Sequence, residues 1–342
     1  MAPAGPRQGA RPGRARRADG AHGDDGARRR GGARRDEGGA PSRAGGWPGA
    51  RPADLEPFEL AGARDGGSGG LDDETGVLLL HGLTATPYSV REWGEFLAAA
   101  GLTVRCPLLP GHGTRWQDLA SVGWRDWYDA VDDAFEDLRR GHARVFVMGL
   151  SMGGTLVLRL AEERGAQVAG VVTVNPSLGS DRWATRLVPL AGRVVRSVRS
   201  SPRGGRLYGR YSDIKAPGVR DVGYDEVPLR AFASLRELWA VTVPDLHRIV
   251  CPVLTFRSVV DHVVEPSSGR RLLAGVTSAP VTERLLPDSY HVATLDNDRE
   301  TIFQGSVEFV QALAPVPATA ARAGVARVTV APGPAMAVEP DA

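Results

Sequence analysis

The sequence predicts an α/β fold, in which helices cover both faces of a mostly parallel sheet and a small helical insert forms a cap. Three observations favour this class. Short apolar runs alternate with amphipathic segments of helical length, as in repeated strand–helix units. Several of these runs are continuous, which is typical of strands buried on both faces. Hydrophobic residues make up 42% of the 342 residues, enough for a large core.

The first half of the expected core supplies three strands and two helices. Residues 57–62 form a short apolar run that suits an edge strand, and 76–82 form a continuous apolar run ended by glycine. Helical spacing of apolar residues and a closing glycine predict a helix over 89–101. A strand over 102–109 and a helix over 124–141 follow.

The second half repeats the pattern around a strand–turn–helix unit. Its predicted strands are 144–149, 168–176, 251–258 and 281–287. Its predicted helices are 153–165 and 300–314. Parallel strands present their carboxyl ends at one edge of the sheet, where open α/β sheets bind ligands. Side chains that follow these strands are therefore the candidates for a site.

The alternation stops in 181–245, which we interpret as a helical cap insert over that edge. Apolar residues at helical spacing predict an amphipathic helix through Trp183, Leu187, Leu190, Val194 and Val198. Eight arginines between 182 and 210 make this helix basic. It either rests on an anionic lipid surface or presents a solvated arginine face while its apolar face packs on the core.

Two terminal segments differ in composition from the rest. Residues 1–54 are rich in glycine, arginine and proline and carry almost no large aliphatic side chains, so we expect them to be disordered. We expect the same of 316–342. The α/β core is then expected in 55–180 and 246–315. The arginine-rich first segment is either a solvated extension or a contact for nucleic acid or anionic lipid.

The composition excludes several classes of protein. No apolar stretch approaches the ~20 residues that span a bilayer, and the arginine pairs near the start lack the apolar run of a signal peptide. Cys106 and Cys251 are the two cysteines, and each lies beside an apolar run, which indicates small buried side chains. No metal constellation or nucleotide fingerprint stands out, so we expect no metal, no cofactor and a cytoplasmic location.

Ser151 lies between glycines in "GLSMGG", after an apolar run and before an amphipathic one. At such a seam the glycines allow the chain to reverse sharply, and the serine Oγ is lifted clear of the sheet. The spacing therefore predicts that Ser151 is a nucleophile. The alternative is an idle serine in a tight strand–helix turn.

A serine nucleophile needs a base, and His291 is the best placed of the seven histidines. It lies in a polar loop after a predicted strand, at the edge where the serine turn is expected. Asp261 ends "CPVLTFRSVVD" about one helix and one strand earlier and is predicted to orient the imidazole. Rival acids are Asp245, Asp288 and Asp296, of which the last two lie too near His291 in the chain to reach behind its ring.

Two backbone amides are predicted to stabilise an oxyanion. The N–H of Met152 lies at a helix N-terminus, whose dipole favours a developing negative charge. The N–H of Leu83 lies in the turn "HGLTATP" that follows an apolar strand. His81 in the same turn is expected to shape it by hydrogen bonding rather than to act as a base.

Several motifs, in this order, resemble those of one known family. They are "LLLHGLTATPYSVREWGEFLAAAG", "PLLPGHGT", "GLSMGG", "SDIKAPG", "DHVVEP" and "SYHVATLDND". They are similar to motifs of bacterial carboxylesterases and monoacylglycerol lipases of the α/β-hydrolase fold, over about 55–315. The resemblance implies an ester hydrolase with nucleophile Ser151, acid Asp261, base His291, a small helical cap and an apolar acyl pocket. In the first turn Leu83 replaces the aromatic residue of the family's usual "GFTGTP".

We therefore expect hydrolysis of a carboxylic ester, with a small acyl ester or monoacylglycerol as the substrate. Cleavage of a lysophospholipid or thioester by the same three residues is the alternative, and an inactive fold that acts as a binding module is a third reading. Among partners we expect a weak contact with an anionic lipid surface and no specific nucleic acid. The chain is expected to be a monomer.

Overall fold

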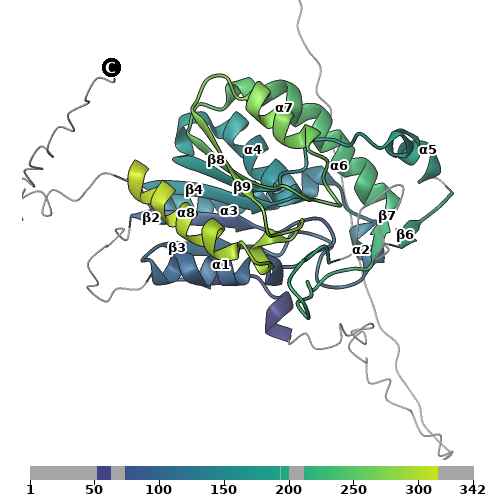
Figure 1. The fold of residues 1–342 in the computed structure, drawn as a ribbon, viewed down its shortest axis with the longest axis horizontal. Coiled ribbons are helices and arrows are strands. Elements are labelled where there is room, and N and C mark those ends of the chain that lie inside the picture. The colour runs from purple at the N-terminus through teal and green to yellow at the C-terminus, as the bar shows by residue number, and fades with distance from the viewer. Residues whose placement is uncertain (1–51, 63–73, 193, 200–211, 315–342) are drawn as a thin grey trace, which may run out of the picture. The chain divides into compact units, whose positions relative to one another are not determined.

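Seven strands form one sheet in the described part of the chain, in the order β1-β3-β2-β4-β5-β8-β9 (Figure 1). They are β1 (Phe58–Leu60), β2 (Thr75–Leu80), β3 (Thr103–Cys106), β4 (Arg144–Leu150), β5 (Gly170–Val174), β8 (Val253–Ser258) and β9 (Val281–Leu286). Strand β1 runs antiparallel to β3 at one edge, and every other neighbouring pair is parallel. The mostly parallel sheet that the sequence predicts is therefore confirmed.

The computed structural model describes residues 52–62, 74–192, 194–199 and 212–314. All of them fall in one compact unit, Arg43–Ala342. The disorder predicted for 1–51 and for 316–342 thus concerns residues outside the described part. No helix in the four described ranges is long and apolar enough to cross a bilayer.

Helices cover both faces of this sheet (Figure 1). They are α1 (Tyr88–Ala99), α2 (Trp116–Leu119), α3 (Trp124–Gly141), α4 (Met152–Arg164), α6 (Leu229–Thr242), α7 (Ser267–Gly275) and α8 (Arg299–Leu313). Helices α1 and α8 pack against one face, and α3 and α4 pack against the other. The four helices predicted for the core are all present, within a residue or two of their expected bounds.

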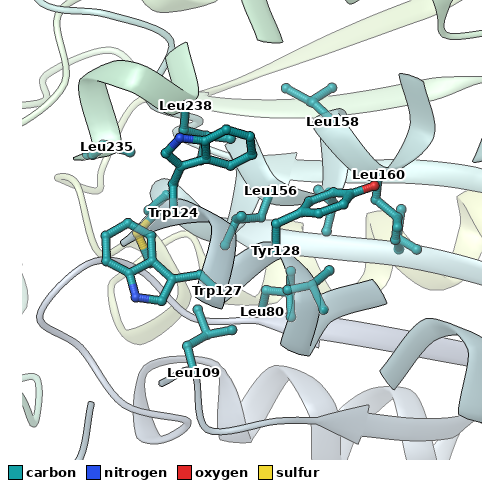
Figure 2. Close-up of a cluster of buried hydrophobic side chains, with 14 of the residues drawn as sticks. Leu80, Leu109, Trp124, Trp127, Tyr128, Leu156, Leu158, Leu160, Leu235 and Leu238 are labelled. Carbon is teal, nitrogen blue, oxygen red and sulfur yellow. The ribbon is translucent and has the colours of Figure 1, made fainter. Parts of the chain in front are cut away.

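Two hydrophobic cores follow from the alternation of side chains along the strands. In β2, Leu78 faces the core beneath α3 and α4, and Leu79 faces the core beneath α1 and α8. Figure 2 shows the first of these cores, in which Trp124 and Tyr128 of α3 lie beside leucines of α4 and α6. Burial on both faces explains why the strands are continuous apolar runs in the sequence.

Residues 52–54 correct the predicted boundary of the first segment. Pro52–Leu55 forms a turn of 3-10 helix rather than disordered chain. The guanidinium of Arg91, in α1, donates a hydrogen bond to the carbonyl of Ala53 at 2.8 Å. Composition alone misses this turn, because the group that holds it lies 38 residues later in the chain.

The segment 181–245 departs from its predicted form. A 3-10 helix, Trp183–Leu187, leads into the one-turn helix α5 (Val188–Ala191), and the chain then forms strand β6 (Ser197–Arg199). Strand β6 pairs antiparallel with β7 (Glu226–Pro228), which precedes α6. The predicted single helix through Val194 and Val198 is therefore wrong. Beyond Gly192 the β-branched valines favour an extended chain over a helix.

The apolar side chains of this segment do not all pack on the core, which was one of the two expectations. Trp183, Leu190 and Val194 are 67%, 66% and 86% exposed. Val188, between them, is fully buried. Packing of the whole apolar face on the core is therefore wrong, and an apolar surface is left open beside the arginines.

Candidate active site

Ser151 occupies the sharp turn between β4 and α4, at the carboxyl edge of the sheet. Its backbone dihedrals are φ 55° and ψ −115°, a conformation that residues with a side chain rarely adopt. The Ser151 N–H donates to the carbonyl of Val174 at 2.9 Å, which ties the turn to the neighbouring strand β5. Such strain persists where the surrounding structure holds it, and it presents the side chain above the sheet.

Two glycines allow this turn. A Cβ atom at Gly149 would lie 2.4 Å from the carbonyl carbon of Gly153. A Cβ atom at Gly153 would lie 2.5 Å from the carbonyl oxygen of Leu80. Both obstacles are backbone atoms, which cannot rotate away as a side chain can. The glycine framing of the serine is therefore a packing requirement of the strand–helix seam.

His291 lies in the loop between β9 and α8 and reaches back to the serine. Its Nε2 lies 3.0 Å from Oγ of Ser151, and its Nδ1 lies 2.8 Å from Oδ2 of Asp261. Only 8% of the His291 side chain is exposed. With the Nδ1 proton directed at the carboxylate, Nε2 is left to accept the serine proton.

Asp261 follows β8 and divides its two oxygens between two tasks. Its Oδ1 accepts the N–H groups of Val263 and Val264, both at 2.8 Å. Its Oδ2 is thereby left for His291. The serine, aspartate and histidine selected from the sequence thus lie in one hydrogen-bonded chain.

The three rival carboxylates have other partners. Asp245 forms an ion pair with Arg159 at 2.9 Å, and Asp288 forms one with Lys215 at 2.6 Å. Asp296 accepts four backbone N–H groups at 2.7 to 2.9 Å. None of the three contacts the ring of His291, so the geometry separates them from Asp261.

The charges around His291 favour its protonated form. Burial alone would lower the pKa of His291, because it removes water from the charged ring. The carboxylates of Asp261, Asp213 and Asp221 act in the opposite direction and outweigh burial, so the pKa is raised above its ordinary value. A ring with this affinity for a proton is suited to accept one from a hydroxyl group.

The turn after β2 lies against the serine. A Cβ atom at Gly82 would be 3.3 Å from Cβ of Ser151, and Leu83 lines the cavity beside it. Met152 is the first residue of α4. Within the described ranges, neither the Leu83 N–H nor the Met152 N–H donates a backbone hydrogen bond. Both amides are therefore free to meet a developing anion.

His81 holds the same turn from within. Its Nδ1–H donates to the carbonyl of Gly82 at 3.0 Å, and its Nε2 accepts the N–H of Leu109 at 3.2 Å. Burial and the neighbouring His112 lower the pKa of His81 to about 3. The ring stays neutral with both nitrogens engaged, so it shapes the turn as the sequence predicts.

Two small cavities adjoin Ser151. One, of about 40 Å³, has the polar side chains of Asp213, Asp221 and Tyr224 in its lining. The other, of about 20 Å³, is lined by apolar side chains of the insert and of the loop after β8, together with serines, Arg182 and Glu265. Asp213 and Asp221 are absent from the predicted site. Asp213 belongs to the motif "SDIKAPG", but nothing in its spacing links it to the histidine.

A sheet of this order, with the serine turn after its central strand, is the architecture of the α/β-hydrolases, and comparisons with known proteins agree with it. The family model described as serine aminopeptidase, S33, matches residues 73–298. The chain belongs to this family of serine hydrolases, and it is an enzyme by that membership.

Three known proteins are similar in sequence to this chain over about two thirds of its length or more. The chain is 38% identical over 239 residues to the thermostable monoacylglycerol lipase of Bacillus sp. (strain H-257), across 68% of this chain and 89% of that protein. It is 25% identical over 244 residues to a carboxylesterase of Bacillus subtilis (strain 168), across 69% and 92%. A solved structure reported with LipS and LipT, two metagenome-derived lipolytic enzymes, matches with a TM-score of 0.68 and 32% identity, across 76% and 98%.

Proposed function

We propose that this chain hydrolyses carboxylic esters, and monoacylglycerols in particular, through an acyl-enzyme on Ser151. The observation that carries the proposal is the hydrogen-bonded chain from Ser151 Oγ to His291 Nε2 at 3.0 Å and from His291 Nδ1 to Asp261 Oδ2 at 2.8 Å. The relatives named as a monoacylglycerol lipase and a carboxylesterase support an ester as the substrate.

The reaction follows from that chain. His291 Nε2 takes the hydroxyl proton while Ser151 Oγ bonds to the ester carbonyl carbon. The N–H groups of Leu83 and Met152 stabilise the negative oxygen that results. The imidazolium, held by Asp261, returns its proton to the alcohol oxygen as the carbon–oxygen bond breaks. A water molecule then attacks the acyl-enzyme in the same way, and the carboxylic acid leaves with the serine restored.

Asp221 supports an alcohol that carries free hydroxyl groups. One of its oxygens, Oδ1, accepts the N–H of Val222 at 2.8 Å. No hydrogen bond joins the other oxygen to a residue of the described ranges, and Asp221 lines the first cavity beside Ser151. Burial raises the pKa of Asp221 to about 7, so near neutral pH the carboxyl can accept or donate a hydrogen bond. A glycerol leaving group presents hydroxyls to such a side chain, and a simple alkyl alcohol does not.

The second cavity beside Ser151 supports an acyl chain, because half of the residues that line it are apolar. Its apolar lining includes Leu83, Phe232, Leu235, Trp239 and Val263. An acyl chain among these side chains leaves the glycerol on the side of Asp221. The two cavities therefore suit an ester with one apolar and one polyhydroxyl end.

Monoacylglycerols and p-nitrophenyl esters of matched acyl length test the proposal. We expect the wild-type chain to hydrolyse both series, with a preferred acyl length that reports the size of the apolar cavity. In Asp221→Ala we expect kcat/KM to fall about tenfold more for the monoacylglycerol than for the p-nitrophenyl ester, because the latter lacks the hydroxyls. Equal losses on both series would contradict the glycerol assignment, and absence of hydrolysis of every ester would contradict the proposal as a whole.

An anionic lipid surface is the proposed source of the substrate. The exposed side chains of Trp183, Leu190 and Val194 lie on the insert, with the exposed arginines Arg186 and Arg196 beside them in the chain. Apolar side chains combined with arginines are typical of segments that lie in a membrane interface.

Vesicle sedimentation tests this contact. We expect Trp183→Ala/Leu190→Ala to bind phosphatidylglycerol vesicles at least about tenfold more weakly than wild type, since two large apolar groups are lost. Thermal unfolding of the variant provides the control for folding. Wild-type binding by a folded double variant would contradict the surface.

We also propose that the chain acts as a monomer in the cytoplasm. Cys106 and Cys251 are buried free thiols, a state common in reducing compartments. Light scattering on the eluted protein tests the monomer, and a dimeric mass would contradict it.

A further inference from the structure

A further carboxylate, Asp213, lies behind the proposed base and has no part in the steps above. Its side chain is completely buried. Its Oδ2 accepts the N–H of His262 at 3.1 Å and the N–H of His291 at 3.3 Å. Its Oδ1 lies 2.9 Å from Nδ1 of His262, and its own carbonyl accepts the N–H of Val292 at 3.0 Å.

These contacts join two loops that are distant in the chain. His262 directly follows the proposed acid Asp261, and His291 is the proposed base. One oxygen of Asp213 therefore bonds to the main chain of both loops, across sequence separations of 49 and 78 residues. A shift of either loop lengthens a hydrogen bond to a buried carboxylate, which is costly because no water replaces it.

Arg182 also holds the loop that carries Asp261, but as a hydrogen-bond donor. Its guanidinium donates to the carbonyls of His262 and Val263, both at 2.9 Å, and it pairs with Glu265 at 3.3 Å. Asp213 accepts the N–H of His262 in this loop, and Arg182 donates to two carbonyls of the same loop. The loop is thus fixed by two residues of the insert region, of which Asp213 alone also bonds to the base loop.

We propose that Asp213 is a positioning residue of this site: it sets the placement of the Asp261 loop against the His291 loop, and its negative charge stabilises the imidazolium that forms when His291 takes the serine proton. The inference rests on the proposed function of Ser151 and His291. It goes beyond that function because Asp213 acts through the histidine and not on the reacting atoms.

The charges that surround the two groups support an electrostatic role. Burial lowers the pKa of His291, whereas Asp261, from the loop after β8, and Asp213 and Asp221, from the chain before β7, raise it. The other titratable group that faces Asp213 is His262, which packs on Tyr290 with ring centroids 4.6 Å apart. No arginine or lysine of the described ranges pairs with Asp213, so a permanent cation does not neutralise its charge.

Asp213→Asn removes the charge and can keep each hydrogen bond. The amide oxygen replaces Oδ2 as the acceptor of the two N–H groups. The amide nitrogen can donate to Nδ1 of His262 once that ring carries its proton on Nε2. The variant therefore separates the charge of Asp213 from its role as a hydrogen-bond partner.

The readout is the rate at which a fluorophosphonate labels Ser151 as a function of pH, since labelling requires no knowledge of the natural substrate. In Asp213→Asn the imidazolium loses a favourable charge. We expect the acid limb of the profile to move down by about one pH unit and the plateau rate to fall about tenfold. An acid limb at the wild-type position in a folded variant would overturn the electrostatic role.

Asp296→Asn is the matched control. Asp296 is also buried. It accepts backbone N–H groups from residues that neighbour Asp213 and His291 in the chain, namely Lys215 at 2.7 Å and Tyr290 at 2.8 Å. It has no contact with His291. We expect this variant to lower the melting temperature while its acid limb stays at the wild-type pH, which is the outcome of a merely structural role.

Two further variants complete the test. Asp213→Ala removes the hydrogen bonds as well, and we expect kcat for a p-nitrophenyl ester to fall about 100-fold with little change in KM, because the base and acid loops separate. An unchanged kcat would overturn the positioning role.

If Asp213→Asn does not fold, Asp213→Glu retains the charge and is expected to keep the wild-type acid limb. A downward shift in this charged variant would overturn the proposal. Failure of wild-type labelling would instead contradict the proposed function.

Discussion

The Oδ2 atom of Asp261 lies 2.8 Å from Nδ1 of His291, although 30 residues separate the two in the chain. Both side chains are nearly sealed from solvent, at 6% and 8% exposure. Water therefore cannot replace either partner. The pair holds the ring so that its second nitrogen points at Ser151, and this makes the relationship sensitive to single substitutions.

Substitution of the serine tests the nucleophile directly. We expect Ser151→Ala to lower kcat on a p-nitrophenyl ester by at least about 10⁴-fold, because no other hydroxyl in the described part of the chain is hydrogen-bonded to His291 Nε2. The fold should be retained, since the methyl group fits where the hydroxymethyl group was. Ser278→Ala, at an exposed serine whose hydroxyl bonds to the carbonyl of His247, is the control and should keep wild-type kcat. Similar kcat values for the two variants would exclude Ser151 as the nucleophile.

Substitution of the acid tests the tautomer of the base. We expect Asp261→Asn to lower kcat by about 10⁴-fold, because an amide nitrogen facing Nδ1 favours the wrong proton position on the ring. The matched control is Asp288→Asn, which removes an exposed ion pair with Lys215. Steady-state kinetics should show wild-type kcat for the control. Comparable losses in both variants would reopen the choice of acid.

The pH dependence of kcat/KM tests the charge environment. His291 is active when neutral, and its pKa is raised, so a higher pH is needed before it loses its proton. We expect activity to rise through a midpoint above the ordinary histidine value of ~6.5. Because the pKa is higher in the folded chain than in the unfolded one, protonated His291 also adds to the free energy of unfolding. This contribution is present below the ordinary histidine pKa and is lost as the pH rises through the raised pKa. A midpoint below ~6.5 would show that burial outweighs the three carboxylates.

The glycine seam predicts a stability difference between two alanine substitutions. Gly149→Ala places a Cβ atom 2.4 Å from the backbone of Gly153, and we expect it to lower the free energy of unfolding by about 3 kcal/mol or more. Gly141→Ala, at the last residue of α3, meets no atom within 4 Å. We expect that control to change stability by less than about 1 kcal/mol, with the sign set by helix propensity. Urea denaturation measures both, and equal midpoints would contradict the packing argument.

Much of the fold can be predicted from local patterns. Residues 145–150 are continuously apolar because β4 is buried on both faces, and the serine that follows needs glycine neighbours because the chain turns back against its own backbone. Each of these causes acts over a few residues. Chain order and strand ends then suffice to bring Asp261 and His291 to the edge where Ser151 lies.

The insert shows where local patterns fail. Helical spacing of Trp183, Leu187 and Leu190 predicts one long helix, whereas the helix ends at Ala191 and Val198 pairs with Val227 in a two-stranded sheet. The pairing partner lies 29 residues away, so helical periodicity in the segment itself does not reveal it. The exposure of these apolar residues likewise depends on what the rest of the chain leaves uncovered.

The sequence by itself determines the strands, the core helices and the serine turn, because hydrophobic periodicity and the contact between Gly149 and Gly153 act between near neighbours. Tertiary structure alone decides which carboxylates surround His291 besides Asp261. Asp213 and Asp221 reach the site through contacts across many tens of residues, and no spacing rule relates them to the histidine. The proton affinity of the base is therefore a property of the folded chain, since it depends on how closely three separate loops bring their charges together.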